Sequence, residues 1–246
     1  MKKRLFRIGN PFVLCLSTAL WMCASVGEAL PKKSVVQISS FSTSVAHQSE
    51  EVKHNLALAC SKLNGLRIAS GGVFNFSDVV GEGSAANGFL DGAVLYRDAL
   101  VSEPGGGLCQ VSSTLFNALL LAGFGIVERH RHYQPVTYVP LGLDATIKYG
   151  KKNLRMKNMS GQDVVIGAVS GDASCNIVVY GGQPPMFTYS METEEDELSL
   201  PLGDFSEREM VRPGIEVYVY RKKFKDGKLV ENFLLYKDFY PPVKLQ

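Results

Sequence analysis

Cysteine and histidine are scarce in this chain of 246 residues, which contains five cysteines and four histidines. Cys15 and Cys23 fall in an apolar N-terminal stretch, which leaves Cys60, Cys109 and Cys175 for the rest of the chain. An odd number leaves at least one thiol free even if the other two pair. Cys60 and Cys175 suit core packing in an expected helix and an expected strand, and the sequence does not show whether they bond to each other.

Apolar runs of membrane-spanning length are also missing. Four basic residues occur in the first seven positions, followed by a short apolar stretch over residues 11–26 and the small-residue site Gly27-Glu28-Ala29. This order is typical of a secretory signal peptide, and the apolar part is short for a transmembrane helix. We interpret residues 1–29 as a signal peptide or an uncleaved signal anchor. We expect an exported protein whose only link to the membrane would be that anchor.

Excess charge of either sign is absent once this leader is set aside. Without the four basic groups and the one acidic group of residues 1–29, 22 of the 26 Lys and Arg and 23 of the 24 Asp and Glu remain, a formal charge of −1. A chain without a basic bias lacks the electrostatic footprint of nucleic-acid-binding proteins, so we expect no nucleic acid partner. The sequence has no internal repeat and no low-complexity tract, and its length suits one large domain or a domain with an appendage.

The stretch around Cys109 is the most informative part of the sequence. Three glycines at residues 105–107 precede an apolar run over residues 108–122, which has helical periodicity and is apolar on its other sides too. This pattern predicts a helix buried within the domain, with Cys109 in its first turn. A helix N-terminus favours a thiolate, and the glycines would let a substrate approach N–H groups that stabilise an oxyanion. The alternative is a buried core cysteine behind an ordinary glycine loop.

Elements of both types are expected before this helix. A helix is predicted between Ser49 and Gly65, where Ser49 can cap and apolar residues recur on one face. A short strand is predicted at residues 71–77, a glycine-bearing surface loop at residues 81–92, and a strand at residues 94–101 that leads directly to the three glycines.

The segments after the Cys109 helix alternate as strands do. Strands are predicted at residues 126–132, 145–149, 164–169 and 176–180, and together they would form an antiparallel sheet against the helix.

In the first of these strands, His130 and His132 would project from the same face as Glu128. Arg129 and Arg131 would take the other face, which we expect to be solvated. The alternative is that one of these arginines binds a substrate carboxylate through a bidentate pair.

Residues 184–246 are interpreted as a small β extension that belongs to the same folded unit as a core domain of residues 30–183. The acidic cluster at residues 192–197 indicates a solvated loop. Asp226-Gly227, between two alternating segments, predicts a hairpin over residues 215–236. The expected fold class is α+β: a central helix with a cysteine at its N-terminus, packed on an antiparallel sheet, plus a small C-terminal β extension.

Cysteine, histidine and a carboxylate together make an activated thiol nucleophile. The imidazole takes the thiol proton, and the third group holds the tautomer of the imidazole. The candidates are Cys109, His132 or His130, and Asp144, and both histidines follow closely after the cysteine helix. With glycine-rich backbone beside the thiol, this set suits acyl transfer from a peptide carbonyl.

Several motifs resemble the VanW family of bacterial exported proteins. The most specific is G-G-G-x-C-Q-V-S at residues 105–112, and others lie at residues 72–77, 80–81, 87–89, 127–132, 135–140 and 142–146. The resemblance covers roughly residues 49–240. One departure is Tyr133, which stands where the family usually has a serine after the second histidine.

This resemblance implies a role in the cell envelope, outside the cytoplasmic membrane, and some VanW domains are L,D-transpeptidases that cross-link peptidoglycan stem peptides. We therefore expect a transpeptidase that uses no cofactor and links the third residues of two stems through a thioacyl intermediate on Cys109. His132 would be the base, because it matches the family's histidine just before the x-P-V segment, with His130 in support and Asp144 orienting it. The residues expected to bind the stem peptide are Asn75, Gly106, Gly107, Gln110, Arg131 and Tyr138.

Other functions fit the same residues. A cysteine peptidase or carboxypeptidase would use water as the acyl acceptor, and the choice depends on how the cleft excludes solvent. A non-catalytic peptidoglycan-binding or glycopeptide-resistance accessory protein would need Cys109 only for packing. A zinc site could use Cys109, His130, His132 and Asp144, since H-x-H on a strand suits zinc.

Overall fold

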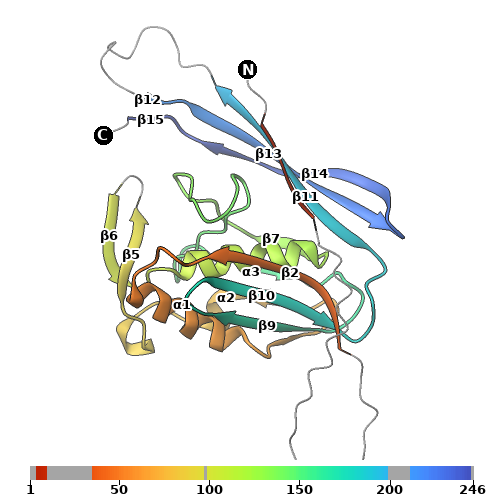
Figure 1. Cartoon of the computed structure of the whole chain (residues 1–246), viewed down its shortest axis with the longest axis horizontal. Coiled ribbons are helices and arrows are strands. Elements are labelled where there is room, and N and C mark those ends of the chain that lie inside the picture. Colours follow the sequence, from red (N-terminus) through yellow and green to blue (C-terminus); the bar gives the residue numbers. More distant parts are fainter. Residues whose placement is uncertain (1–3, 10–34, 97–98, 199–210, 245–246) are drawn as a thin grey trace, which may run out of the picture.

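The computed structural model describes residues 4–9, 35–96, 99–198 and 211–244, and its fold is α+β with mostly antiparallel strands. The expected class is confirmed at this level. A central helix, α3 (Leu108–Leu121), has a large sheet on either side of it (Figure 1). Nearly every residue of α3 is buried, because strands and another helix surround it.

The first large sheet packs against α3. Its strand order is β2 (Val36–Ser44), β10 (Ser174–Gly181), β9 (Val164–Ser170) and β3 (Arg67–Ile68), and all neighbours are antiparallel. The strands predicted at residues 164–169 and 176–180 are confirmed as β9 and β10. β2 has no predicted counterpart, because hydroxyl residues replace apolar ones on its buried face. Ser39 is buried there and donates a hydrogen bond to the carbonyl of Ala118 in α3 (2.7 Å).

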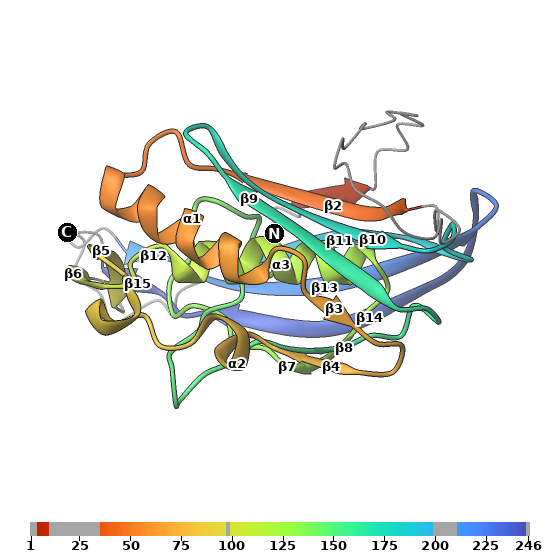
Figure 2. The same cartoon turned by 90° about the horizontal axis from the view of Figure 1, so that it is seen from below.

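Helix α1 (Glu50–Leu63) packs against this sheet and against α3 (Figure 2). The hydroxyl of Ser49 accepts a hydrogen bond from the N–H of Val52 and so caps the helix. Its buried apolar face carries Val52, Leu56, Ala59, Cys60 and Leu63. The helix predicted between Ser49 and Gly65 is therefore confirmed.

A small three-stranded sheet holds the segment that follows α3. Its order is β4 (Val73–Asn75), β8 (Arg155–Lys157) and β7 (Gly125–Glu128), with the short helix α2 (Phe76–Val80) directly after β4. Because β7 belongs to this sheet and β9 and β10 to another, the single sheet expected after α3 is in fact divided.

Two of the strands predicted after α3 differ from the structure. The strand predicted at residues 126–132 ends early, because β7 stops at Glu128 and the two histidines lie beyond it. The strand predicted at residues 145–149 is wrong: the N–H of Thr146 donates to the carbonyl of His130 (2.8 Å), and Lys148 then pairs with Lys152 around a tight turn. One bond to the His130 segment and a tight turn thus replace the expected ladder.

A hairpin of β5 (Asp91–Tyr96) and β6 (Ala99–Pro104) precedes α3, so the single strand predicted at residues 94–101 is wrong. Two charged residues, at positions 97 and 98, divide that stretch in the sequence and lie outside the described residues. The glycine-bearing segment before the hairpin is a loop up to β5, as predicted, apart from one 3₁₀ turn, η1 (Ala85–Asn87).

Gly106 and Gly107 let three segments converge at the start of α3. A Cβ on Gly106 would lie 2.4 Å from the carbonyl carbon of Gly92 in β5. Gly107 has a φ of +101°, and a Cβ there would lie 2.6 Å from Cδ1 of Leu56 in α1. Only glycine fits at these two positions, so the glycine motif brings α1, the β5–β6 hairpin and α3 together.

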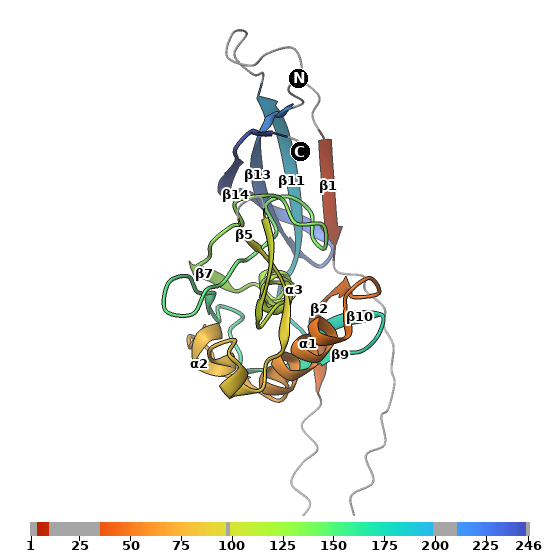
Figure 3. The same ribbon diagram turned by 90° about the vertical axis from the view of Figure 1, so that its left-hand side faces the viewer.

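The second large sheet covers the opposite side of α3 (Figure 3). Its order is β1 (Arg4–Gly9), β11 (Thr188–Leu198), β13 (Gly214–Lys225) and β14 (Lys228–Tyr240), and β12 (Val211–Arg212) pairs separately with β15 (Val243–Lys244). The predicted hairpin is confirmed as β13 and β14. Asp226 and Gly227 have φ values of 49° and 74°, as a two-residue hairpin turn of type I′ requires.

The acidic cluster at residues 192–197 lies in β11, so the solvated loop predicted there is wrong. Met191 and Thr193 on alternate positions are buried, which leaves Glu192 on the other face. There Glu192 forms an ion pair with Lys222 of the neighbouring strand (2.5 Å). Opposite charges on adjacent strands stabilise the pairing, and the acidic composition alone does not reveal them.

Most of the predicted leader, residues 1–29, lies outside the described residues. Only its residues 4–9 are described, as β1 paired with β11, and the signal peptide or anchor stays a prediction. Across the described ranges, no helix combines the length and apolar character needed to cross a bilayer.

Candidate active site

Cys109 lies in the first turn of α3, directly after the left-handed Gly107. The side chain is half-buried, and its Sγ lies 3.5 Å from Oγ1 of Thr146 and 3.6 Å from the carbonyl oxygen of Ile147. Within the described part of the chain, the N–H groups of Gly107 and Cys109 have no hydrogen-bond acceptor. These two donors at the positive end of the helix are available to a developing oxyanion.

His132 contacts this thiol from the extended segment that follows β7. Its imidazole is 8% exposed, and Nδ1 donates to Oδ2 of Asp144 over 2.6 Å. The backbone N–H of His132 donates to the same oxygen, also over 2.6 Å. Because the Nδ1 proton is committed to Asp144, Nε2 is the nitrogen that exchanges a proton with Cys109.

The thiol and the imidazole hold each other in their charged forms. Burial raises the pKa of Cys109, but the hydrogen bond and charge of His132 outweigh burial, so the pKa lies below its ordinary value. Burial likewise lowers the pKa of His132, but hydrogen bonds with Asp144 and Cys109 raise it to about 9. Between these two pKa values, a thiolate faces an imidazolium.

Asp144 orients the imidazole. It is 1% exposed, and besides the two bonds from His132 it accepts hydrogen bonds on Oδ1 from Nη2 of Arg129 (3.0 Å) and from the hydroxyl of Tyr240 (2.7 Å). Burial raises the pKa of Asp144, but the hydrogen bond with His132 and the charge of Arg129 outweigh burial and bring it to about 2. Asp144 is therefore ionised at neutral pH.

The segment that carries Asp144 is docked on α3 by polar side chains. Asn117 donates to the carbonyl of Leu143 (2.7 Å), and the hydroxyl of Ser113 accepts a hydrogen bond from the N–H of Ala145 (2.9 Å). Asn117 and Ser113 are both buried. Polar residues on an otherwise apolar helix thus fix the carboxylate relative to the thiol.

Arg129 is buried, so the solvated face predicted for it is wrong. Its side chain is 6% exposed, because the strand ends at Glu128 and no longer alternates. Nη1 binds both carboxylate oxygens of Asp238 (2.8 and 2.6 Å), while Nε donates to the carbonyl of Asp144 and Nη2 to that of Gly142. With Oδ1 of Asp144 also bound, all five N–H groups of the guanidinium have partners.

The His130 side chain bonds to Glu128 and not to Cys109. Its Nε2 is 3.0 Å from Oε1 of Glu128, and its side chain is 38% exposed. The two histidines were expected to share a strand face, but both follow the end of β7, and the backbone turns His132 toward Asp144 instead. The structure therefore joins His132 and Asp144 to Cys109 and leaves His130 outside.

Tyr138 and Arg131, two of the residues expected to bind substrate, lie at the site. The hydroxyl of Tyr138 is 3.5 Å from Nε2 of His132, and the two rings meet edge to face. Burial and the charge of Cys109 raise the pKa of Tyr138, so its phenol is protonated and can donate a hydrogen bond. Arg131 donates to the carbonyl of His132 (2.7 Å), and its guanidinium carbon lies 5.3 Å from the centre of the Tyr240 ring.

Gly106, Gln110 and Asn75 serve other contacts in the structure. Gly106 packs on Gly92 and its carbonyl accepts a hydrogen bond from Asn55 (2.9 Å). The buried amide of Gln110 bonds to Thr43 and Ser44 of the β2 strand, and Asn75 caps α2. The structure brings none of these three side chains or carbonyls into contact with the thiol.

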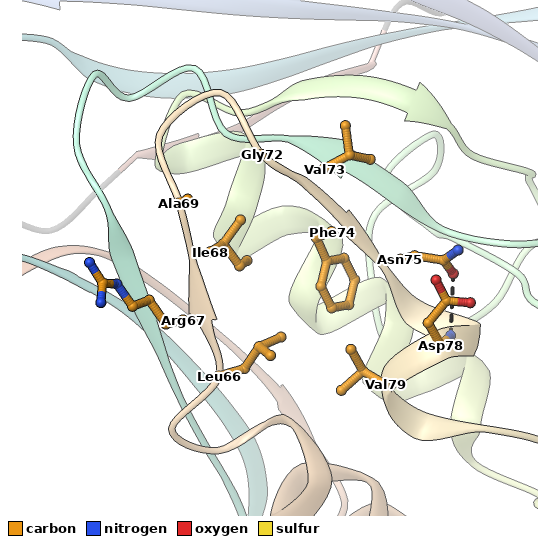
Figure 4. Close-up of a pocket in the computed structure, with 10 residues that line it drawn as sticks. All are labelled: Leu66, Arg67, Ile68, Ala69, Gly72, Val73, Phe74, Asn75, Asp78 and Val79. Carbon is orange, nitrogen blue, oxygen red and sulfur yellow. Dashed lines mark hydrogen bonds between the residues drawn. The ribbon is translucent and has the colours of Figure 1, made fainter.

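Two surface pockets lie on the side of α2. The first has a volume of about 230 Å³, and Phe74 is among its lining residues (Figure 4). At its edge the side-chain oxygen of Asn75 accepts a hydrogen bond from the backbone N–H of Asp78. The second, of about 340 Å³, is lined by Glu128 and by the turn at residues 149–153. Asn75 and the partner of His130 thus belong to a surface separate from the Cys109 contacts.

Asp238 and Tyr240 reach the site from the C-terminal sheet, and sequence reasoning missed this role. Tyr240 reads from the sequence as part of an aromatic cluster that packs the hairpin, and Asp238 attracts no attention there. The sequence does contain one signal for this role, the two-residue spacing of Tyr236, Asp238 and Tyr240. Residues at that spacing lie on one face of a strand, so a carboxylate lies between two aromatic residues on the inward face of β14.

The described residues do not form a metal site from three or more His, Cys, Asp and Glu side chains. Of the four ligands considered for zinc, His130 is paired with Glu128 and the Nδ1 of His132 with Asp144. The donor arrangement therefore gives the zinc hypothesis no support.

Comparison with known proteins places these residues in context. The family model described as VanW like protein matches residues 51–180, just over half of the chain. The Uncharacterized protein YoaR of Bacillus subtilis (strain 168) is 33% identical over 153 residues, which are 62% of this chain and 50% of that protein. The Vancomycin B-type resistance protein VanW of Enterococcus faecalis (strain ATCC 700802 / V583) is 30% identical over 142 residues, 56% of this chain and 52% of that protein. The chain spans about half the length of these curated relatives, and no solved structure matches it.

Proposed function

The chain belongs to the VanW-like protein family, and from this premise we propose that it is a cell-envelope cysteine acyltransferase acting on peptidoglycan. In particular, we propose that it is an L,D-transpeptidase, an enzyme that joins two stem peptides. One relative is named as a vancomycin resistance protein, which supports a role related to the cell wall or to resistance.

The arrangement of Cys109, His132 and Asp144 is the observation that carries this proposal. The Nδ1–Oδ2 distance of 2.6 Å fixes the imidazole, and the lowered pKa of Cys109 makes its thiolate available at a lower pH than that of an ordinary cysteine. A thiolate at a helix N-terminus, a histidine and an orienting carboxylate are the parts that acyl transfer from a carbonyl requires.

In the first half-reaction, the Cys109 sulfur attacks the carbonyl carbon of the third residue of a tetrapeptide stem. The N–H groups of Gly107 and Cys109 stabilise the oxyanion. The C–N bond then breaks, Nε2 of His132 gives its proton to the leaving amine, and the terminal D-amino acid departs. A thioester on Cys109 remains.

In the second half-reaction, the amine of a neighbouring stem attacks the thioester. Neutral His132 accepts a proton from this amine, the C–S bond breaks, and Cys109 leaves as a thiolate beside the restored imidazolium. The phenol of Tyr138, close to Nε2, can donate a hydrogen bond to a substrate carbonyl or to the incoming amine. The partners of the protein are then peptidoglycan stem peptides, and its location is outside the cytoplasmic membrane.

The test is to incubate purified protein with disaccharide-tetrapeptide fragments and to identify the products by mass spectrometry. A cross-linked dimer that lacks one terminal D-amino acid, formed by the wild type and by His130→Ala but not by Cys109→Ala, would support transpeptidation. A tripeptide alone would mean that the same site transfers the acyl group to water. No product from any stem, with an unreactive Cys109, would make the protein a binding module.

A further inference from the structure

We propose that Tyr240 and Asp238, at the end of β14, are positioning residues of the active site. They position Asp144 and, through it, His132. The proposal deepens the proposed function and rests on it. It also concerns a part of the chain beyond residues 51–180, which the family model matches.

The hydroxyl of Tyr240 ties together two points of the segment that carries the carboxylate. It donates to Oδ1 of Asp144 over 2.7 Å and accepts the N–H of Gly142 over 3.1 Å. Tyr240 is 1% exposed, so these bonds form away from water. Since Oδ2 of Asp144 is bound by His132 and Oδ1 by Tyr240, the plane of the carboxylate is fixed from both ends.

Asp238 acts on Asp144 through Arg129. It binds Nη1 of Arg129 with both oxygens, and it is 9% exposed. A buried guanidinium between two carboxylates is held at a set distance from each, and its charge is shared between them. Without Asp238, Arg129 would pair with Asp144 alone and draw that carboxylate away from the imidazole.

The charged and titratable groups around this network come from α3, β14 and the segments at residues 129–132 and 138–144. Asp144 faces His132, Arg129 and Tyr240, while Arg129 also faces Asp238 and the ring of Tyr236. His132 faces Cys109 and Tyr138, and Arg131 lies over the ring of Tyr240. A packing role alone would need only the rings, and neither the Tyr240 hydroxyl that binds Asp144 nor the Asp238 carboxylate that binds Arg129.

The rate at which iodoacetamide alkylates Cys109 measures this effect without any substrate. We would follow the modified Cys109 peptide by mass spectrometry over a pH series in wild type, Tyr240→Phe and Asp238→Asn. A looser Asp144 weakens the bond that keeps His132 charged. The pH midpoint of alkylation should therefore rise in both variants, and the rate below the midpoint should fall about three- to tenfold, because one pKa unit is tenfold in thiolate.

Tyr218→Phe is the matched control, because its hydroxyl lies on the same sheet but bonds to Glu216. Its midpoint should equal that of the wild type. The proposal would be overturned if the pH midpoint of alkylation stayed at or below the wild-type value in both Tyr240→Phe and Asp238→Asn. If Tyr240→Phe does not fold, Asp238→Asn alone decides. A shifted midpoint in a protein that turns over no stem peptide would uphold the positioning role and remove the transpeptidase.

A separate observation concerns the other two thiols. The sulfur atoms of Cys60 in α1 and Cys175 in β10 lie 3.6 Å apart, and both side chains are buried. We infer that they form a disulfide when the chain folds in an oxidising compartment. Two thiols lose two protons and two electrons, and the electrons reduce the disulfide of a thiol–disulfide oxidoreductase or of a small oxidised thiol. Cys109 would then be the free thiol among these three.

This bond would close a loop between residues 115 positions apart and join α1 to the first sheet. Refolding with oxidised glutathione should lower the intact mass by two hydrogens, and peptide mapping should find Cys60 linked to Cys175. The oxidised protein should melt about 5–10 °C above its reduced form. The control Cys60→Ser should show no such redox difference. A wild type that keeps all three thiols free after oxidative refolding would overturn the inference.

Discussion

At the scale of single residues, His132 and His130 separate the proposed catalytic machinery from its surroundings. The sequence places them two positions apart, but only His132 bonds to Asp144 and contacts Cys109. His132→Ala should lower the rate of cross-linking about 100- to 10,000-fold, the usual range for loss of a general acid–base group. His130→Ala should change it less than twofold, and the pair is compared by initial rates on one stem substrate. The opposite result would assign the base to His130.

The pH dependence of activity follows from the two pKa shifts at the site. The pKa of Cys109 is lowered and that of His132 is raised to about 9, so the reactive thiolate–imidazolium pair exists between them. Activity should rise with pH as Cys109 ionises, below the range of an ordinary cysteine, and fall as His132 loses its proton at about pH 9. Rates measured over a pH series should give this bell shape. A profile that keeps rising beyond that pH would contradict the pair.

Sequence reasoning selected Cys109, His132 and Asp144 for their chemistry, and the structure brings the three together. The sequence did not reveal the residues that hold them in place. Cys109 follows a glycine motif, and Asp144 follows His132 within a short stretch. Arg129 looked solvated because a strand face was assumed for it, whereas the buried carboxylates of nearby Asp144 and distant Asp238 neutralise its charge. Pairing across about a hundred residues leaves no local trace in composition or spacing.

At the scale of elements, the glycine motif is first a packing device. Gly107→Ala should destabilise the protein by about 1–3 kcal/mol more than Gly161→Ala, because strain and overpacking act together at Gly107. Both glycines have positive φ, but a Cβ on Gly107 would strike Leu56, whereas that on Gly161 would meet open space. Urea denaturation of the two variants measures the difference. Equal losses would mean that α1 moves aside without cost.

The elements that could be predicted are those with a strong local pattern. α1 has a cap and an apolar face, and the β13–β14 hairpin has Asp226-Gly227. β2 was missed because its buried Ser39 bonds to α3, and β11 because its Glu192 pairs with Lys222 across the sheet. In both strands tertiary contacts outweigh local propensity.

At the scale of the whole molecule, stability should depend on pH through the same network. The pKa of Asp144 falls from 3.8 to about 2 on folding, so its stabilising contribution is present above 3.8 and is lost as the pH falls through 2. The pKa of His132 rises from 6.5 to about 9, so its contribution is present below 6.5 and is lost as the pH rises through 9. Melting temperatures over a pH series should fall at both ends.

Asp144→Asn tests the acid end of this dependence. It removes the carboxylate that both His132 and Arg129 need, so the melting temperature should be lower near neutral pH and should change less on acidification than in the wild type. If the melting temperature of the variant fell with acidification as much as that of the wild type, the acid-sensitive groups would lie elsewhere in the chain.

Tyr240 follows Cys109 by more than a hundred residues, and this separation has a consequence for the timing of activity. If the chain is exported N-terminus first, Cys109 leaves the translocation channel more than a hundred residues before the hydroxyl that completes its network. Until β14 has emerged and docked, the carboxylate has no second anchor and the nucleophile is incompletely primed. Under that order of export, the full reactivity of Cys109 would be delayed until β14 has crossed the membrane.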